Sequence, residues 1–404
     1  MILSKKSVIL ILISVFIINT ASIVVYTYAP RYLLHLGTEK PLMQLIITIF
    51  PLTAFLFPPL YGYLSDKTQN RFIFIVAGTI GMNISYLFLF LTQDLILIVI
   101  VIFFFGFFMA SSNLLITLFA ELVEDDKTLI SYINAIIVAG WFVGAQSGGI
   151  FIDIYGIEKI MLFTLLISLP TIIFVAFIRE NRSMILERYK NRVESNTNVS
   201  ILTNPEIKSP ISQSVYYGLF FRNFSIKPIM PILAIIMSFH LSSDTEIGFL
   251  IGINFLMQIF QMLLIGKLVS NKTIKSFMII GYSLSAISVF GYIISTNFWS
   301  YLFFQFLVSF SYSMHWAATI TYIAQNTIPK NKGRYMGYAN TSIFSGSFAG
   351  GILFSLLLLS FNSDYYVAMS FMVIFPVIST FIIFVKFKPS KITVVNSKMD
   401  IISE

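Results

Sequence analysis

Apolar and polar positions fall into long blocks along this chain. Twelve apolar stretches of roughly 20 to 27 residues are separated by short polar connections. A helix of about 20 apolar residues crosses a bilayer core about 30 Å thick and pairs all its backbone groups internally. The pattern predicts an all-α membrane protein with transmembrane helices over 7–29, 42–61, 72–91, 95–120, 129–152, 159–178, 212–238, 246–265, 276–295, 298–325, 335–360 and 365–385.

The basic residues predict how the helices are oriented. If the N-terminus is cytoplasmic, the connections on that side hold 21 of the 26 Lys and Arg residues. Cytoplasmic loops of membrane proteins carry this excess of positive charge. We therefore expect a multi-pass protein of the plasma membrane with both termini in the cytoplasm. The net charge of +8 then reflects topology and contact with anionic lipid, and no nucleic-acid partner is expected.

The composition agrees with lipid as the solvent and narrows the chemistry. Apolar residues make up 57% of the chain, charged residues 11%, and there are 42 Phe and no Cys. The lack of Cys excludes disulfides, thiolate zinc sites and thiol catalysis. No metal-binding, phosphate-loop or hydrolase motif is present, so we expect no cofactor, no metal and no enzymatic activity.

The chain divides into two halves that resemble each other. A polar segment at 179–211 predicts a cytoplasmic linker between an N-terminal six-helix bundle, 1–178, and a C-terminal one, 212–404, that ends in a short cytoplasmic tail. The loop 62–71 matches 266–275 at an offset of 204 positions, and two glycines of the fifth stretch match two of the eleventh at an offset of 206. Duplicated bundles of this kind form many secondary transporters, whose solute site lies between the halves.

Two motifs resemble those of a known family. The loop Gly62-x-x-x-Asp66-Lys67-x-x-x-Arg71 resembles the signature between the second and third helices of the major facilitator superfamily, with Gln69 and Asn70 departing from it. The fifth stretch is similar to the antiporter motif of the drug:proton branch and carries Ala145 where that motif has Pro. The resemblance covers essentially the whole chain and implies a fold of two pseudo-symmetric six-helix bundles.

The resemblance implies a gate at the first motif, formed by Gly62, Asp66, Lys67 and Arg71. Glycine permits close approach of two helices, and a carboxylate can hold a neighbouring helix end in one arrangement. A plain solvated loop is the alternative. In the fifth stretch, Gly140, Gly144, Gly148 and Gly149 allow close helix packing in lipid. A packing role and a coupling role stay equally open there.

Arg222 is the clearest candidate for binding a solute. The apolar run from 229 to about 241 is too short to span the membrane, so the seventh helix must begin near 212 and bury Arg222 about 15 Å deep. An unpaired Arg at such a depth costs about 2.5 to 3.5 kcal/mol. In the family resembled, the seventh helix lines the central cavity. The alternative for Arg222, and for Lys227, is structural pairing or snorkelling.

Other polar residues inside the stretches are candidate cavity-lining residues. Tyr312, His315, Thr319 and Tyr322 share one face of the tenth stretch, while Asn19, Ser22 and Tyr26 share one in the first, and Asn254, Gln258 and Gln261 one in the eighth. For each Asn or Gln an interhelical hydrogen bond is the alternative. His315 has the side chain best suited to exchanging a proton during transport, and a structural role is equally open.

No carboxylate lies deep inside a stretch, although drug antiporters of this family commonly carry one there. An Arg without an acid favours an anionic or neutral polar solute. We expect a monomeric transporter of a small organic solute that works by alternating access and is driven by a proton gradient, with protons as the coupling ion, or alternatively by a solute gradient. The alternatives are a multidrug efflux antiporter and, in another class, a membrane receptor or sensor that transports nothing.

Overall fold

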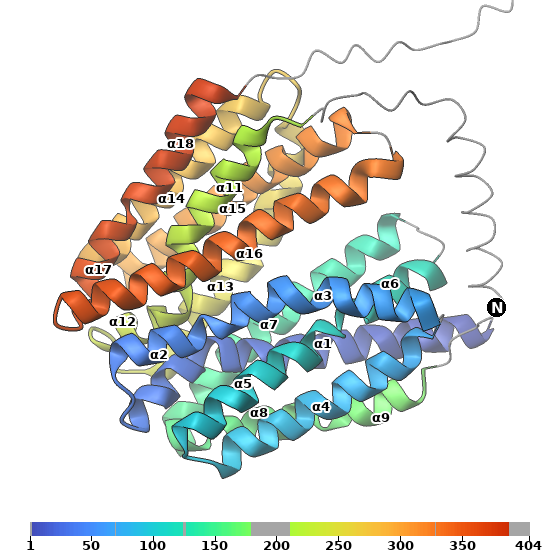
Figure 1. The fold of residues 1–404 in the computed structure, drawn as a ribbon. Helices are drawn as coiled ribbons and strands as arrows, with labels where there is room; N and C mark the ends of the chain where they lie inside the picture. The colour runs from blue at the N-terminus through green and yellow to red at the C-terminus, as the bar shows by residue number, and fades with distance from the viewer. Residues whose placement is uncertain (1, 69, 124–126, 179–210, 328, 388–404) are drawn as a thin grey trace, which may run out of the picture.

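The computed structural model describes residues 2–68, 70–123, 127–178, 211–327 and 329–387. The described residues are helical apart from short connections (Figure 1). The N-terminal half contains α1 (Ile2–His35), α2 (Lys40–Ile47), α3 (Ile49–Thr68), α4 (Arg71–Leu91), α5 (Leu95–Ala110), α6 (Asn113–Leu122), α7 (Lys127–Tyr155), η1 (Ile157–Lys159), α8 (Ile160–Ser168) and α9 (Pro170–Ala176). The C-terminal half contains α11 (Gln213–Ile229), η2 (Met230–Ile232), α12 (Leu233–Ser238), α13 (Asp244–Leu268), α14 (Ile274–Ile294), α15 (Phe298–Asn326), α16 (Pro329–Ser360), α17 (Tyr365–Met372) and α18 (Ile374–Lys386).

Several predicted stretches consist of two or three consecutive helices. The seventh is divided into α11, η2 and α12, where Pro228 and Pro231 remove backbone donors. Pro170 begins α9 and so divides the sixth stretch in the same way. The first helix runs from Ile2 to His35 and is longer than its predicted apolar stretch, because apolarity marks the lipid-immersed part of a helix and not its ends.

The chain is a multi-pass membrane protein. Within the described residues, eleven continuous helical segments are long and apolar enough to cross a membrane. The tenth predicted stretch, α15, is the remaining long helix, and it is more polar because it buries Gln305, Ser309, Ser311, Ser313 and His315. Large side chains such as Ile96, Trp299 and Phe381 lie exposed on the outside of the bundles, as a protein solvated by lipid requires.

Matching helices pack against each other through glycine in both halves. A Cβ added at Gly140 or Gly144 of α7 would collide with backbone of α1, and one added at Gly346 or Gly350 of α16 would collide with backbone of α11. The two glycine pairs lie 206 positions apart, and the α1 and α11 carbonyls that they meet lie 204 apart. The internal repeat seen in the sequence is therefore also a repeat of packing.

The halves meet at one end of the molecule and separate towards the other. In Figure 1 they touch around α2, α12 and α17 and diverge towards the side that holds the N-terminus. We name the first side the packed end, comprising 31–48, 149–156, 239–248 and 351–365. The second is the divergent end, comprising 62–68, 70–71, 266–275 and 329–337. A Cβ added at Gly149, Gly248 or Gly351 of the packed end would strike the opposite half. One added at Gly62, Gly266 or Gly333 of the divergent end would meet nothing within 4 Å.

Candidate solute-binding site

Arg222 lies on α11 inside the C-terminal half, and its side chain is 2% exposed. Its Nε donates a hydrogen bond to the Ser285 hydroxyl at 3.1 Å, and its Nη1 donates to the Asn223 amide oxygen at 3.3 Å. The guanidinium carbon lies 5.6 Å from the centre of the Tyr312 ring, within the range of a cation–π contact. Three helices, α11, α14 and α15, thus hold the guanidinium.

Ser311 lies between Ser285 and His315 and forms hydrogen bonds through its hydroxyl and its backbone carbonyl. The hydroxyls of Ser285 and Ser311 lie 2.6 Å apart, and Ser311 donates to the Gly281 carbonyl at 2.7 Å. The Nδ1 of His315 donates to the Ser311 carbonyl at 2.8 Å, so that bond fixes the ring tautomer when His315 is neutral. A Cβ at Gly281 would lie 2.8 Å from the His315 amide nitrogen. Glycine is therefore what lets α14 and α15 approach closely enough for these hydrogen bonds.

The guanidinium of Arg222 has no carboxylate partner in the part of the chain that the structure describes. The ion pairs found there join Arg31 to Asp244 and Arg71 to Asp66. Its Nη2 donates no hydrogen bond to any described residue. A buried cation without a counter-ion costs about 2.5 to 3.5 kcal/mol, so the site favours a ligand that brings negative charge or acceptor oxygens.

Some of the predicted cavity residues lie near Arg222, and others form hydrogen bonds elsewhere in the C-terminal half. The His315 ring centre lies 5.5 Å from that of Tyr312. Thr319, fully buried, donates to the His315 carbonyl of its own helix at 2.8 Å. Asn254 is buried and donates to the Gln305 carbonyl at 3.0 Å, and Gln258 donates to Asn254 at 2.7 Å. The amides of α13 thus tie α13 to α15.

The first helix contributes polar groups that face the fifth and eighth predicted stretches. Asn19 donates to the Val15 carbonyl at 2.8 Å and accepts a hydrogen bond from the Trp141 indole at 2.9 Å. The Trp141 ring lies 5.3 Å from that of Phe255 in the other half. Tyr26 is half-buried on the same helix. Asn19 therefore positions an aromatic contact between the halves.

The predicted gate motif contacts neighbouring residues of its own loop. Asp66 and Arg71 form an ion pair at 3.5 Å, and the Lys67 ammonium lies 5.9 Å from the Tyr63 ring centre. Gly62 has open space where a side chain would point. The close approach that this glycine permits is thus not used in the observed conformation.

The glycines of the fifth stretch serve two interfaces. Gly140 and Gly144 contact α1, as described above. A Cβ at Gly148 would strike the Tyr28 ring, and one at Gly149 would strike the Asp244 carbonyl in the other half. The hydroxyl of Tyr28 donates to the Ala145 carbonyl at 2.8 Å. The motif therefore sits where α7 meets both α1 and α13.

Polar contacts across the packed end were not anticipated from sequence. Asp153 of α7 accepts hydrogen bonds from the hydroxyls of Ser243 and Thr245 and from the backbone N–H groups of Asp244 and Thr245, all within 2.8 Å. Ser243 is the N-cap residue immediately before α13, and its own side chain does not cap the helix. Asp153 therefore caps α13 from the opposite half, and Arg31 pairs with Asp244 beside it. These partners lie 90 or more positions apart, so no local pattern joins them.

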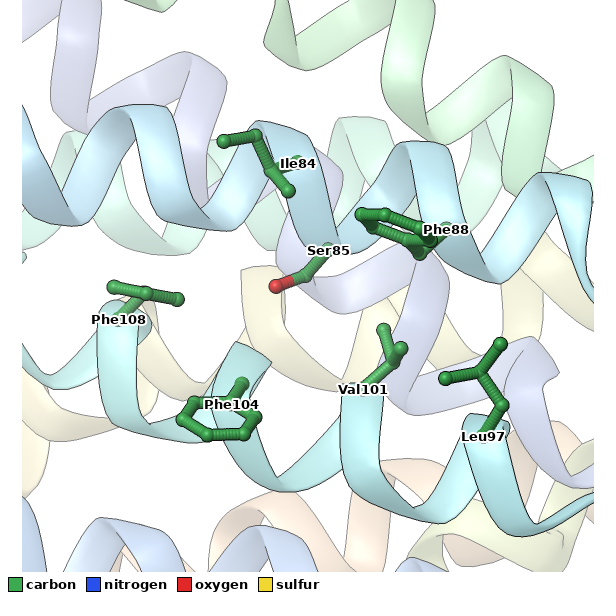
Figure 2. Close-up of a pocket in the computed structure, with 7 residues that line it drawn as sticks. All are labelled: Ile84, Ser85, Phe88, Leu97, Val101, Phe104 and Phe108. Atoms are coloured by element: carbon green, nitrogen blue, oxygen red, sulfur yellow. The ribbon is translucent and has the colours of Figure 1, made fainter.

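The pocket in Figure 2 lies between α4 and α5, away from Arg222. It is lined by Ile84, Ser85, Phe88, Leu97, Val101, Phe104 and Phe108. Its one hydroxyl, that of Ser85, already donates to the Gly81 carbonyl at 2.8 Å. Ile84, Phe88 and Phe104 are each more than 40% exposed. This surface suits lipid chains, and it offers a polar solute no specific contact.

The chain is similar to solved structures of transporters along nearly its whole length. It is 12% identical to the nucleoside transporter NupG, covering 96% of this chain and 100% of that one with a TM-score of 0.76. It is 11% identical to the POT family transporter PepTSo, with 94% and 97% covered and a TM-score of 0.75. For a D-xylose–proton symporter the values are 12%, 96%, 99% and 0.73. At these identities the likeness establishes the fold.

No curated protein matches the sequence significantly. Residues 28–364 match the model of the MFS_1 like family, which covers well over half of the chain. The family and the similar structures are transporters and not enzymes. From its sequence match and its fold, the chain belongs to the MFS_1 like family within the major facilitator superfamily.

Proposed function

We propose that the protein is a secondary active transporter that moves a small anionic or neutral polar organic solute by alternating access. The observation that carries the proposal is Arg222, a buried guanidinium with a free Nη2 and no carboxylate partner among the described residues. A solute oxygen at Nη2 would complete its hydrogen bonding, and a negative charge would offset its burial. Tyr312 and His315 would form the surrounding wall of the site.

The positive-inside pattern supports an orientation in the plasma membrane. It places the divergent end, with the N-terminus, in the cytoplasm and the packed end outside. The observed conformation is then inward-facing, and a solute would reach Arg222 from the cytoplasm. Transport requires the second conformation, in which the packed end separates and the loops at Gly62 and Gly266 close on each other's half.

We further propose that an ion gradient drives the cycle and that protons are the coupling ion. His315 is the candidate proton carrier because its imidazole bonds to the backbone of Ser311, whose hydroxyl contacts the Ser285 hydroxyl that Arg222 binds. Alternatively, His315 only fixes the Ser311 backbone. The protein is proposed to act as a monomer, because one C-terminal half supplies every contact described for Arg222.

Two other functions make different demands on the site. A multidrug efflux antiporter for cations would need a buried carboxylate, and no ion pair or hydrogen bond in the described residues places one at Arg222. A receptor or sensor on this scaffold would bind the solute without net flux. Flux in proteoliposomes therefore separates the transporter from the sensor, and solute charge separates it from the drug antiporter.

The test replaces Arg222 in purified protein. A thermal-shift screen against charged and neutral metabolites first identifies a solute, because a ligand of the folded state raises its stability. Arg222→Gln should then lower transport of that solute by about a hundredfold, the cost of losing two or three charge-assisted hydrogen bonds, while folded yield stays near wild type. Arg222→Lys keeps the charge and should recover part of the activity. Equal flux in wild type and Arg222→Gln would exclude this site.

A further inference from the structure

Lys227 lies on the same helix as Arg222, five positions towards the packed end, and its side chain is exposed. The span that contains it is the most enclosed of the candidate spans, with 72% of its apolar window buried against 33 to 56% for the others. Exposure on so enclosed a helix favours a side chain that faces the space between the halves over one that faces lipid. The neighbouring Pro228 carbonyl accepts a hydrogen bond from Gln44 of the other half at 3.4 Å, so Lys227 lies where the two halves meet.

The packing of α11 shows which of its faces is left for Lys227. Gly346 and Gly350 of α16 cover the face around Phe220 and Phe224. Another face meets α14, through Gly218 against Tyr282 and Arg222 against Ser285. Asn223 and Lys227, four positions apart, share the face between these two contacts.

The same face connects Lys227 to the guanidinium. Arg222 donates through Nη1 to the amide oxygen of Asn223, which turns the guanidinium towards the side of the helix that carries Lys227. Arg222 and Lys227 lie five positions apart on one helix, about one and a half turns, so their like charges repel each other. No described carboxylate forms an ion pair with either.

We infer that Arg222 and Lys227 together bind a small organic solute that carries two negative charges, such as a dicarboxylate or a phosphate monoester. This inference rests on the proposed function and narrows its substrate class. The planar fork of Arg222 suits one anionic group, and the flexible Lys227 ammonium supplies a movable point charge for a second. Two repelling cations are stabilised most by a ligand that neutralises both.

Chemical modification of Lys227 tests the site without knowledge of the natural solute. Purified protein is treated with an N-hydroxysuccinimide ester, and mass spectrometry follows the peptides that contain Lys227 and Lys332. Lys332 is exposed at the divergent end and serves as the internal control. Inorganic phosphate or sulfate should slow modification of Lys227 by about tenfold relative to chloride at equal ionic strength, and leave Lys332 unchanged. In Arg222→Gln the protection of Lys227 should disappear.

Three outcomes of this labelling would overturn the inference. They are an unreactive Lys227 in the absence of dianions, protection of Lys227 and Lys332 alike, and full protection in Arg222→Gln. The first would place the ammonium away from solvent, the second would reduce the effect to ionic screening, and the third would remove Arg222 from the site.

Flux measurements then distinguish a dicarboxylate solute from a phosphate monoester. They also test the role of Lys227 separately from transport itself. Proteoliposomes are loaded with succinate, with glycerol 3-phosphate, or with lactate as the singly charged comparison. Wild type should favour one of the dianions over lactate by about tenfold, and Lys227→Gln should lower the ratio of dianion flux to lactate flux to about one. An unchanged preference in Lys227→Gln would refute the role of Lys227 and leave the transporter intact. Protection by phosphate without flux of any solute would refute transport and leave the anion site intact.

Discussion

The packed end and the divergent end of this protein contain similar helices and glycines but use them differently. At the packed end, glycines of α7, α13 and α16 bring backbone of one half against the other, and Asp153 caps α13 across the boundary. At the divergent end, the glycines at 62 and 266 meet nothing within 4 Å, and Asp66 pairs within its own loop. If the transport cycle alternately closes the packed end and the divergent end, a substitution that weakens one end should favour the conformation in which that end is open.

The chain contains no Cys, so a single engineered thiol reports accessibility without background. Tyr26→Cys on α1 is the reporter, and a membrane-impermeant maleimide added outside proteoliposomes of defined orientation measures opening of the packed end. Low labelling is expected in the observed conformation. Substitutions at either end of the protein should change that labelling.

The largest effect is expected from Gly149→Leu. A side chain there must displace the Asp244 backbone of the opposite half, and overpacking of this kind costs about 3 kcal/mol, roughly a hundredfold in the ratio of conformations. Labelling from outside should rise accordingly and transport should fall. Gly333→Leu at the divergent end is the matched control, because nothing lies within 4 Å of its Cβ. Equal labelling in both variants would mean that the packed end does not seal the protein.

A smaller rise is expected from Asp153→Ala. Loss of a helix cap costs about 0.5 to 2 kcal/mol, so outside labelling should increase roughly twofold to thirtyfold. The control is Asp364→Ala, which removes a cap on α17 that lies at the same end but entirely within one half. A similar rise in the control would attribute the effect to local unfolding and not to separation of the halves.

The smallest change, with the opposite sign, is expected from Asp66→Asn. In the observed conformation the Asp66 carboxylate is exposed and pairs with Arg71 of the same loop, so its removal should cost that conformation little, about 0 to 1 kcal/mol. If Asp66 holds the divergent end shut in the other conformation, the variant should lower outside labelling by a few fold. The double variant with Asp153→Ala should fall between the two single variants, because the sites are far apart. A rise with Asp66→Asn alone would contradict the gate.

The sequence predicted the fold because lipid constrains it so strongly. Long apolar stretches, the repeat between 62–71 and 266–275 and the depth of Arg222 are all visible without coordinates. The division of the seventh stretch at Pro228 and Pro231 was not anticipated, since apolarity alone counts the whole segment as one span. Proline positions, weighed together with length, would have indicated the break.

Part of the candidate site could be predicted from the sequence in the same way. Arg222, Tyr312 and His315 are costly or aromatic groups inside spans, and they attract attention individually. Ser285 and Ser311 do not, because serine is common in membrane helices and usually bonds to its own backbone. Only the approach of α14 to α15 at Gly281 makes them a bridge between Arg222 and His315. The predicted gate, cavity lining and domain boundaries stay predictions, and most of the linker lies outside the described residues.

The glycine contacts also bear on how such proteins diverge. Where α7 and α16 rest on the carbonyls of α1 and α11, the touching surface is largely main chain, which every amino acid shares. Substitutions elsewhere on these helices leave that surface unaltered as long as a few hydrogen-sized side chains are retained. Such a packing surface makes few demands on the rest of the sequence, and this chain shares its fold with NupG at 12% identity. Replacement of Gly140, Gly144, Gly346 or Gly350 would separate the helix backbones directly, so these four positions limit the sequence more than their small size suggests.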